Sequence, residues 1–198
     1  ESNIAVAITI SGSGCPAGAY TTPATLTWIN GVSCSVSVQQ TAATADARTV
    51  FSQWSDGPVS PSRNIVASPG AVYTIVMATD YRLSRLVSGS GTVSGTDGFY
   101  AAGSTVTLTA TAGTGQQFNG WTGSVTSAAN PLSVVMDGAK TITANFVPAL
   151  SSVRIETNVA AQFNVSGAGC PVGPDAAPVT LTWNTGTACS LSIPSPQG

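Results

Sequence analysis

Apolar and polar residues alternate along much of the chain, which is the period of a β-strand with one buried face. In the segment 104–112, Val106, Leu108 and Ala110 fall on one face and threonines fall on the other. The segments 24–28 and 33–38 alternate in the same way, and the Asn-Gly pair between them predicts a hairpin turn. No window has the i, i+3, i+4, i+7 spacing of an amphipathic helix. The pattern predicts an all-β chain with little or no helix.

The alternating pattern is itself repeated. The segment 8–38 recurs without a gap at 163–193, and the match extends back from residue 156 to residue 1. Two cysteines and a tryptophan are each repeated 155 positions later: Cys15 and Cys170, Trp28 and Trp183, Cys34 and Cys189. A fixed period of this kind is typical of a tandem array.

A shorter motif recurs within the period. Phe51 and Trp54 are three residues apart, and Phe118 and Trp121 have the same spacing. The chain therefore divides into a cysteine-bearing unit (1–80), a cysteine-free unit (81–150) and the first half of a second cysteine-bearing unit (151–198). Frequent Gly and Pro turns favour small β-sandwich or β-grasp-like modules.

The aromatic pairs are the predicted centres of the cores. On a regular strand, residues three apart point to opposite faces. We therefore expect a bulge or turn at residues 119–120 that lets Phe118 and Trp121 both point inward, and we place Phe51 and Trp54 in the core in the same way.

One stretch has a family pattern. From Gly91 to Phe146 the chain contains Gly-Thr-Val, Tyr-x-x-Gly-x-x-Val-x-Leu-x-Ala, Phe-x-Gly-Trp, Asn-Pro and Thr-x-Thr-Ala-x-Phe, in that order. This stretch resembles the divergent internalin-type B-repeat of large bacterial surface and secreted proteins. The cysteine-bearing units 1–80 and 156–198 look like variants of it. The resemblance implies a secreted or cell-surface array of small β modules and no catalytic residue.

Composition narrows the function. The chain is 42% hydrophobic and only 7% charged, and its net charge is −2. Six basic residues scattered from Arg48 to Arg154 form no patch for phosphates, which excludes nucleic acid as a partner. No apolar run approaches the roughly 20 residues that span a bilayer, so we expect no membrane insertion. The first residues do not resemble a signal peptide, and we expect any such peptide to have been removed.

The four cysteines predict two disulfides, Cys15–Cys34 and Cys170–Cys189, each enclosing 18 residues. Disulfides indicate an oxidising compartment, which agrees with a secreted or surface location. The alternatives are a zinc site, which usually needs closely spaced C-x2-4-C pairs, and redox catalysis, which usually needs C-x-x-C. Both spacings are absent from the sequence.

Other candidate sites have simpler interpretations. Trp28 and Trp183 end alternating segments and are predicted core residues, with a sugar-binding platform as the alternative. Asp-Gly pairs at 56, 97 and 137 are typical of turns and lack the further oxygen ligands of a calcium loop. The single lysine, Lys140, is expected to protect a strand edge rather than form an isopeptide bond. Asn164 begins a glycosylation sequon. We expect no metal and no cofactor.

Two function classes remain. The chain has no histidine and no evident carboxylate pair, which disfavours an enzyme. The first hypothesis is a structural stalk or fibre whose partners are neighbouring repeats or copies of itself, joined by strand sharing where a unit is incomplete. The second is an adhesin or carbohydrate-binding appendage that contacts glycans or a host surface through Tyr20, Tyr81, Phe99 and Tyr100.

Overall fold

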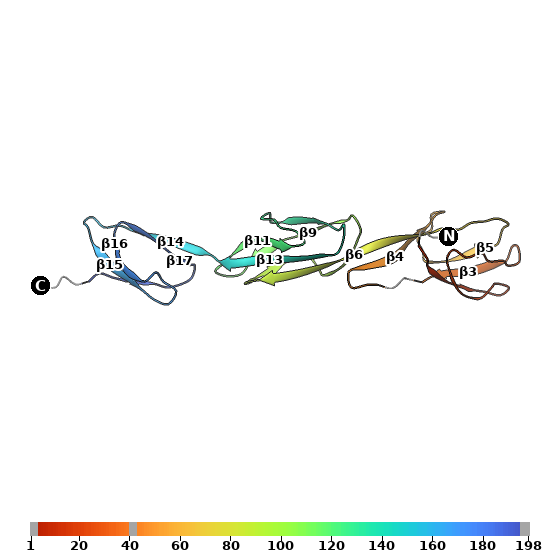
Figure 1. Ribbon diagram of the computed structural model, residues 1–198, viewed down its shortest axis with the longest axis horizontal. Helices are drawn as coiled ribbons and strands as arrows, with labels where there is room; N and C mark the ends of the chain where they lie inside the picture. The colour runs from red at the N-terminus through yellow and green to blue at the C-terminus, as the bar shows by residue number, and fades with distance from the viewer. Residues whose placement is uncertain (1–3, 40–42, 195–198) are drawn as a thin grey trace. The chain divides into compact units, whose positions relative to one another are not determined.

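The computed structural model describes residues 4–39 and 43–194, and Figure 1 draws their strands as arrows. All regular structure in these two ranges is β-strand, and no residue within them lies in a helix. The predicted all-β fold, built from several small sheets, is therefore confirmed. The same ranges contain no helix with the length and apolar character that crossing a bilayer requires.

The strands in chain order are β1 (Ala7–Ser11), β2 (Gly18–Thr21), β3 (Ser33–Val38), β4 (Ala47–Trp54), β5 (Ser62–Val66), β6 (Ile75–Ser88), β7 (Gly91–Val93), β8 (Gly98–Ala101), β9 (Thr105–Leu108), β10 (Ala110–Ala112), β11 (Gln116–Gly123), β12 (Leu132–Val135), β13 (Lys140–Pro148), β14 (Leu150–Ile155), β15 (Gln162–Ser166), β16 (Gly173–Ala176), β17 (Val179–Asn184) and β18 (Ser190–Ser192).

The chain forms two compact units, and each is described by itself. The first comprises the described residues of Glu1–Ser84, Thr96–Val106 and Ser133–Thr141. The second comprises those of Arg85–Gly95, Thr107–Leu132 and Ile142–Gly198. The division into 1–80, 81–150 and 151–198 stays a prediction.

The first unit is built on an antiparallel sheet in the order β2-β1-β3-β5. Its core follows the alternation of the sequence, because Ile8 and Ile10 of β1 are buried and so are Cys34 and Val36 of β3. Ile10 lies opposite Val36 in the register of the two strands. In a second part of this unit, β4 and β8 each pair with β6.

In the second unit, β11 pairs with β13 and β7 pairs with β10, both antiparallel. The register of β11 against β13 shifts between Phe118 and Trp121, so the predicted bulge is confirmed. Ala110 lies on the buried face together with Leu108, as the alternation predicted.

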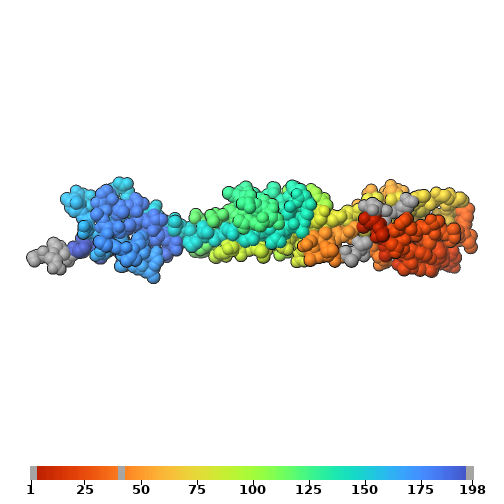
Figure 2. Space-filling model, in the orientation of Figure 1, coloured from red at the N-terminus to blue at the C-terminus, as the bar shows by residue number. Residues whose placement is uncertain are grey.

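The second copy of the cysteine-bearing segment repeats the fold of the first. β15 and β16 occupy the positions of β1 and β2 shifted by 155 residues, and β18 corresponds to the middle of β3. The register is repeated as well, because Ile8↔Tyr20 in the first copy becomes Phe163↔Asp175 in the second. The space-filling view in Figure 2 draws this copy in blue and the first copy in red. The repeated sequence therefore encodes a repeated pairing.

The hairpin predicted around Asn30-Gly31 is wrong. Residues 24–28 are not a strand, and β3 pairs with β1 and β5 instead. A turn does form, because the Val32 N–H donates to the Ile29 carbonyl at 3.1 Å. The turn passes the chain from one layer to the other, which lets Leu26 and Trp28 pack against the apolar face of the sheet. A hairpin would have placed both segments in the same layer.

Basic residues have a consistent place in this fold. All six are located in strands: Arg48 in β4, Arg63 in β5, Arg82 and Arg85 in β6, Lys140 in β13 and Arg154 in β14.

Candidate functional site

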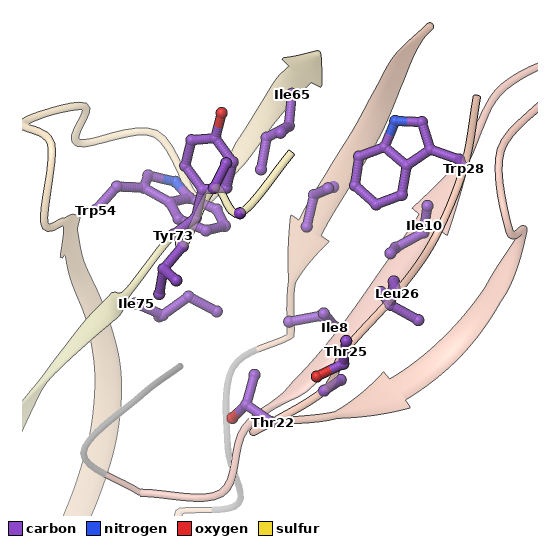
Figure 3. A pocket seen from close by; sticks show the side chains of 15 residues that line it. Ile8, Ile10, Thr22, Thr25, Leu26, Trp28, Trp54, Ile65, Tyr73 and Ile75 are labelled. Carbon is purple, nitrogen blue, oxygen red and sulfur yellow. The ribbon is translucent and has the colours of Figure 1, made fainter. Parts of the chain in front are cut away.

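The first unit has an apolar groove of about 360 Å³, which we call the Trp28–Trp54 groove. Figure 3 shows Leu26 and Trp28 on one side of it and Trp54, Tyr73 and Ile75 on the other. Its floor is the apolar face of the sheet, contributed by side chains such as Ile8, Ile10 and Val36. Tyr73 is the only residue with an ionisable side chain among those that line it.

Two tryptophans hold the walls of the groove in place. The Trp28 indole N–H donates to the Val32 carbonyl at 3.1 Å, and the Trp54 indole N–H donates to the Ser60 carbonyl at 2.9 Å. Trp54 is buried, whereas Trp28 is half-buried and turns one side toward the groove. Because both polar atoms are already paired, the rings offer mainly apolar surface.

Arg63 stacks beside the second wall. Its guanidinium carbon lies 5.2 Å from the ring centroid of Trp54 and 5.3 Å from that of Tyr73. A guanidinium N–H also donates to the Asp56 carboxylate at 2.6 Å. This hydrogen bond lowers the pKa of Asp56 below its ordinary value and raises the pKa of Arg63. The cation–π contacts and the ion pair fix the edge of this wall.

The first wall is the backbone of residues 24–28. No backbone hydrogen bond joins residues 24–28 to any other residue that the structure describes. A backbone edge of this kind presents N–H and C=O groups that can pair with another strand. An apolar groove beside such an edge is suited to binding an extended polypeptide.

Both cysteine pairs are joined within their own copies. The Cα atoms of Cys15 and Cys34 are 5.7 Å apart, and those of Cys170 and Cys189 are 5.9 Å apart. Each bridge ties the loop that follows one strand to the neighbouring strand segment, which agrees with the predicted disulfide framework.

The aromatic pairs lie as follows. Phe118 and Trp121 are 5.2 Å apart between ring centroids, and Phe51 and Trp54 are 6.0 Å apart. Trp121 is 1% exposed, and its indole N–H donates to the Ala129 carbonyl at 2.8 Å. The two phenylalanines are half-buried beside their tryptophans.

Trp183 in the second copy matches Trp28. It is half-buried, and its indole N–H donates to the Thr187 carbonyl at 3.1 Å, the counterpart of the Trp28–Val32 bond.

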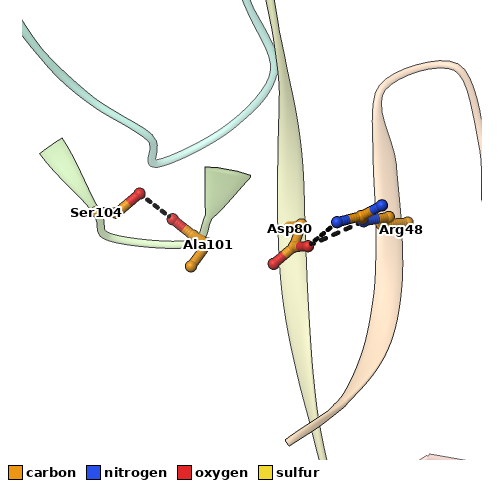
Figure 4. Close-up of polar contacts among 4 residues, drawn as sticks. All are labelled: Arg48, Asp80, Ala101 and Ser104. Carbon is orange, nitrogen blue, oxygen red and sulfur yellow. Dashed lines mark hydrogen bonds and ion pairs between the residues drawn. The ribbon is translucent and has the colours of Figure 1, made fainter. Parts of the chain in front are cut away.

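One polar cluster was not found from the sequence. Asp80 in β6 is 8% exposed, and Arg48 in β4 donates its Nε–H to Asp80 Oδ2 at 2.9 Å (Figure 4). The guanidinium also lies 4.9 Å from the Phe99 ring centroid. Along the sequence the nearest base to Asp80 is Arg82, and only the β4–β6 register brings Arg48 opposite it. Only a prediction that β4 pairs with β6 would have identified this ion pair from the sequence.

The remaining candidate residues have ordinary partners. Lys140 binds the Asp137 carboxylate, and this hydrogen bond lowers the pKa of Asp137. Within the part of the chain that the structure describes, no three acidic, Cys or His side chains are grouped as metal ligands would be. Asn164 is exposed in β15.

The aromatic residues considered for glycan contact are not freely exposed. Tyr20, Tyr81, Phe99 and Tyr100 are each half-buried. The Tyr100 hydroxyl donates to the Thr96 carbonyl at 2.8 Å, and the Tyr20 hydroxyl donates to the Pro16 carbonyl at 3.0 Å. These contacts describe packing at strand ends, and the glycan hypothesis stays a prediction.

Comparison with known proteins gives one match. Residues 81–150 match the model of the divergent InlB B-repeat domain family, which confirms the resemblance inferred from the motifs between Gly91 and Phe146. No curated protein and no solved structure matches the chain significantly.

Proposed function

From the B-repeat match of residues 81–150 we propose that this chain is a structural repeat segment of a bacterial surface or secreted protein, serving as a stalk or fibre. The repeated register carries the proposal, because the same strand pairing recurs after 155 residues with the same disulfide. A chain that repeats its fold at a fixed period can lengthen by adding periods, each stabilised by its neighbours. The disulfides support a location outside the cytoplasm.

Neighbouring repeats or copies of the chain are the proposed partners. β3 has a strand on each side, β1 and β5. Its counterpart β18 pairs only with β15 among the strands that the structure describes. The side of β18 that corresponds to the β5 side of β3 is where a strand from a neighbouring repeat or from another copy would add, and strand sharing of this kind would produce a filament.

The proposal is tested with proteins that contain one, two and four periods. Solution scattering and electron microscopy should give a length that grows by a constant increment for each period. Particles whose longest dimension stays constant as periods are added would contradict a stalk. Sedimentation of the 198-residue chain tests the filament, since a monomer at every concentration contradicts strand sharing between chains.

A further inference from the structure

The same sequence element has a strand partner in one copy and none among the described residues in the other. In the second copy, β17 pairs antiparallel with β14 along its whole length. The counterpart of β17 in the first copy is the segment 24–29, as the 155-residue offset requires, and its residues 24–28 have no backbone hydrogen bond to another described residue. The second copy therefore shows what belongs beside this edge.

Each copy has one part of the structure around this edge, and the other copy has the other part. The first has the far wall of the groove, Trp54 and Tyr73, but its edge has no neighbouring strand among the described residues. The second has the strand but no counterpart of that wall among residues 156–194.

In the second copy, the apolar face of β14 is only partly covered by other described residues. Val153 of β14 lies opposite Leu181, and because directly opposed residues share a face, both point to the same side of the sheet. Leu181 is 5% exposed, yet Val153 is 39% exposed. No described residue therefore covers Val153 on the side where Trp54 and Tyr73 lie in the first copy.

We propose that the Trp28–Trp54 groove is the docking site for one antiparallel strand of the β14 sequence, supplied by the period that stands directly ahead of it in the array. This inference rests on the proposed array. The chain connection is already known from the second copy, where β14 ends at Ile155 and Glu156, the counterpart of Glu1, follows at once. Each period then completes the core of the next.

The second copy also sets the register. β14 places Ser151 opposite Trp183 and Val153 opposite Leu181. In the groove, the docked strand therefore places its Ser151 opposite Trp28 and its Val153 opposite Leu26. The valine then lies over the apolar floor, and the backbone groups of 24–28 that face the docked strand gain partners.

Amide hydrogen exchange on two proteins tests the docking. The first is the 198-residue chain, and the second is the same chain with residues 141–155 copied directly ahead of Glu1. In the first protein, the amides of 24–28 should exchange much faster than those of 179–184. In the second, exchange should slow by at least about tenfold at those amides of 24–28 that face the added strand, because these amides are now in a ladder. Unchanged exchange at 24–28 in a folded extended protein overturns the proposal.

A matched variant checks that docking, and not added length, causes the protection. In the extended protein, the added copy of the strand carries Val153→Asp, which places a charge over the apolar floor. Protection at 24–28 should be lost while protection at 179–184 stays. If the variant protects 24–28 as well as the unchanged strand, the proposed register is wrong.

The source of the strand is tested on the 198-residue chain alone. Its exchange at 24–28 should not depend on protein concentration. Protection that rises with concentration, together with association in sedimentation, would mean that a second copy fills the groove and would overturn the assignment to the preceding period.

The result is separable from the test of the array. If particle length grows with each period while 24–28 stays unprotected, the stalk holds and the docking fails. If 24–28 is protected in the extended protein and length does not grow, the docking holds and the stalk fails.

Discussion

At the scale of single residues, the fold depends on glycines that leave room for larger side chains. A Cβ added at Gly91 would lie 2.4 Å from Phe146 Cε2, although the backbone there is one that any residue can adopt. Phe146 is buried and its ring lies 5.9 Å from that of Phe118, so it has little space to move. At Gly12 the same test gives 2.9 Å to Cys15 Sγ, and at Gly167 it gives 2.8 Å to Cys170 Sγ. Both copies therefore have a glycine at the position where a side chain would collide with the cystine sulfur.

Gly91→Ala should lower the free energy of unfolding by about 1–3 kcal/mol, because the added methyl group overpacks the core against Phe146. The control is Gly138→Ala, where an added Cβ meets nothing within 4 Å. Urea denaturation followed by tryptophan fluorescence measures both. Equal stability of the two variants would show that Phe146 moves aside freely.

The Asp56–Arg63 pair should make stability depend on pH in one direction. The hydrogen bond from Arg63 lowers the pKa of Asp56 in the folded chain below its ordinary value of 3.8. A lowered pKa means that the pair stabilises the fold above the unfolded pKa and that this contribution is lost as the pH falls through the folded pKa. Asp56→Asn should therefore lower the Tm at neutral pH, and the difference from the original chain should shrink below about pH 4. A difference that grows on acidification would contradict this assignment. The effect is small because the carboxylate is exposed to solvent.

At the scale of elements, the sequence predicted what depends on neighbours along the chain. The alternation of 104–112, the bulge after Phe118 and the two disulfides each follow from local spacing. The placement of 24–28 did not follow, because a hairpin and a crossing between layers bury the same alternating residues. The Arg48–Asp80 pair also depends on a strand register that the sequence does not reveal. The local pattern indicates which residues are buried. Which strands pair depends on the whole sheet and is not evident from the local pattern.

The cystines should stabilise their own copies. Each bridge closes a loop of 18 intervening residues, which in the chain-entropy model is worth about 3 kcal/mol. Replacing Cys15 and Cys34 by serine should therefore speed amide exchange in β1 and β3 and leave β15 unchanged. The matched pair Cys170→Ser with Cys189→Ser should give the reverse result. Faster exchange in both copies from either variant would contradict independent stabilisation.

At the scale of the whole molecule, cohesion is mainly apolar. Only 7% of the residues are charged, and three of the acids pair with bases at positions that solvent reaches, namely Asp56, Asp137 and Glu156. Pairs at such positions contribute little to stability. The cores around Trp54 and Trp121 and the backbone ladders therefore account for most of the stability.

Stability should accordingly change little with salt. Raising sodium chloride from about 0.05 to 1 M screens exposed charges almost completely. The Tm should therefore shift by no more than about 2 °C, whereas loss of several ion pairs worth 1 kcal/mol each would shift it further. Thermal unfolding followed by circular dichroism measures the change. A large fall in Tm would show that the few ion pairs matter more than their exposure indicates.

The location of every basic residue within a strand has a consequence for resistance to proteolysis. Trypsin-like proteases cut after lysine or arginine and need that bond in a flexible segment, which strands do not provide. Loops of this chain contain Ser, Thr, Gly, Pro and Asn but offer such a protease no cleavage point among the described residues. Cleavage by such a protease would therefore require local unfolding of a strand. A chain built this way resists a common class of protease because its cationic residues all lie within strands.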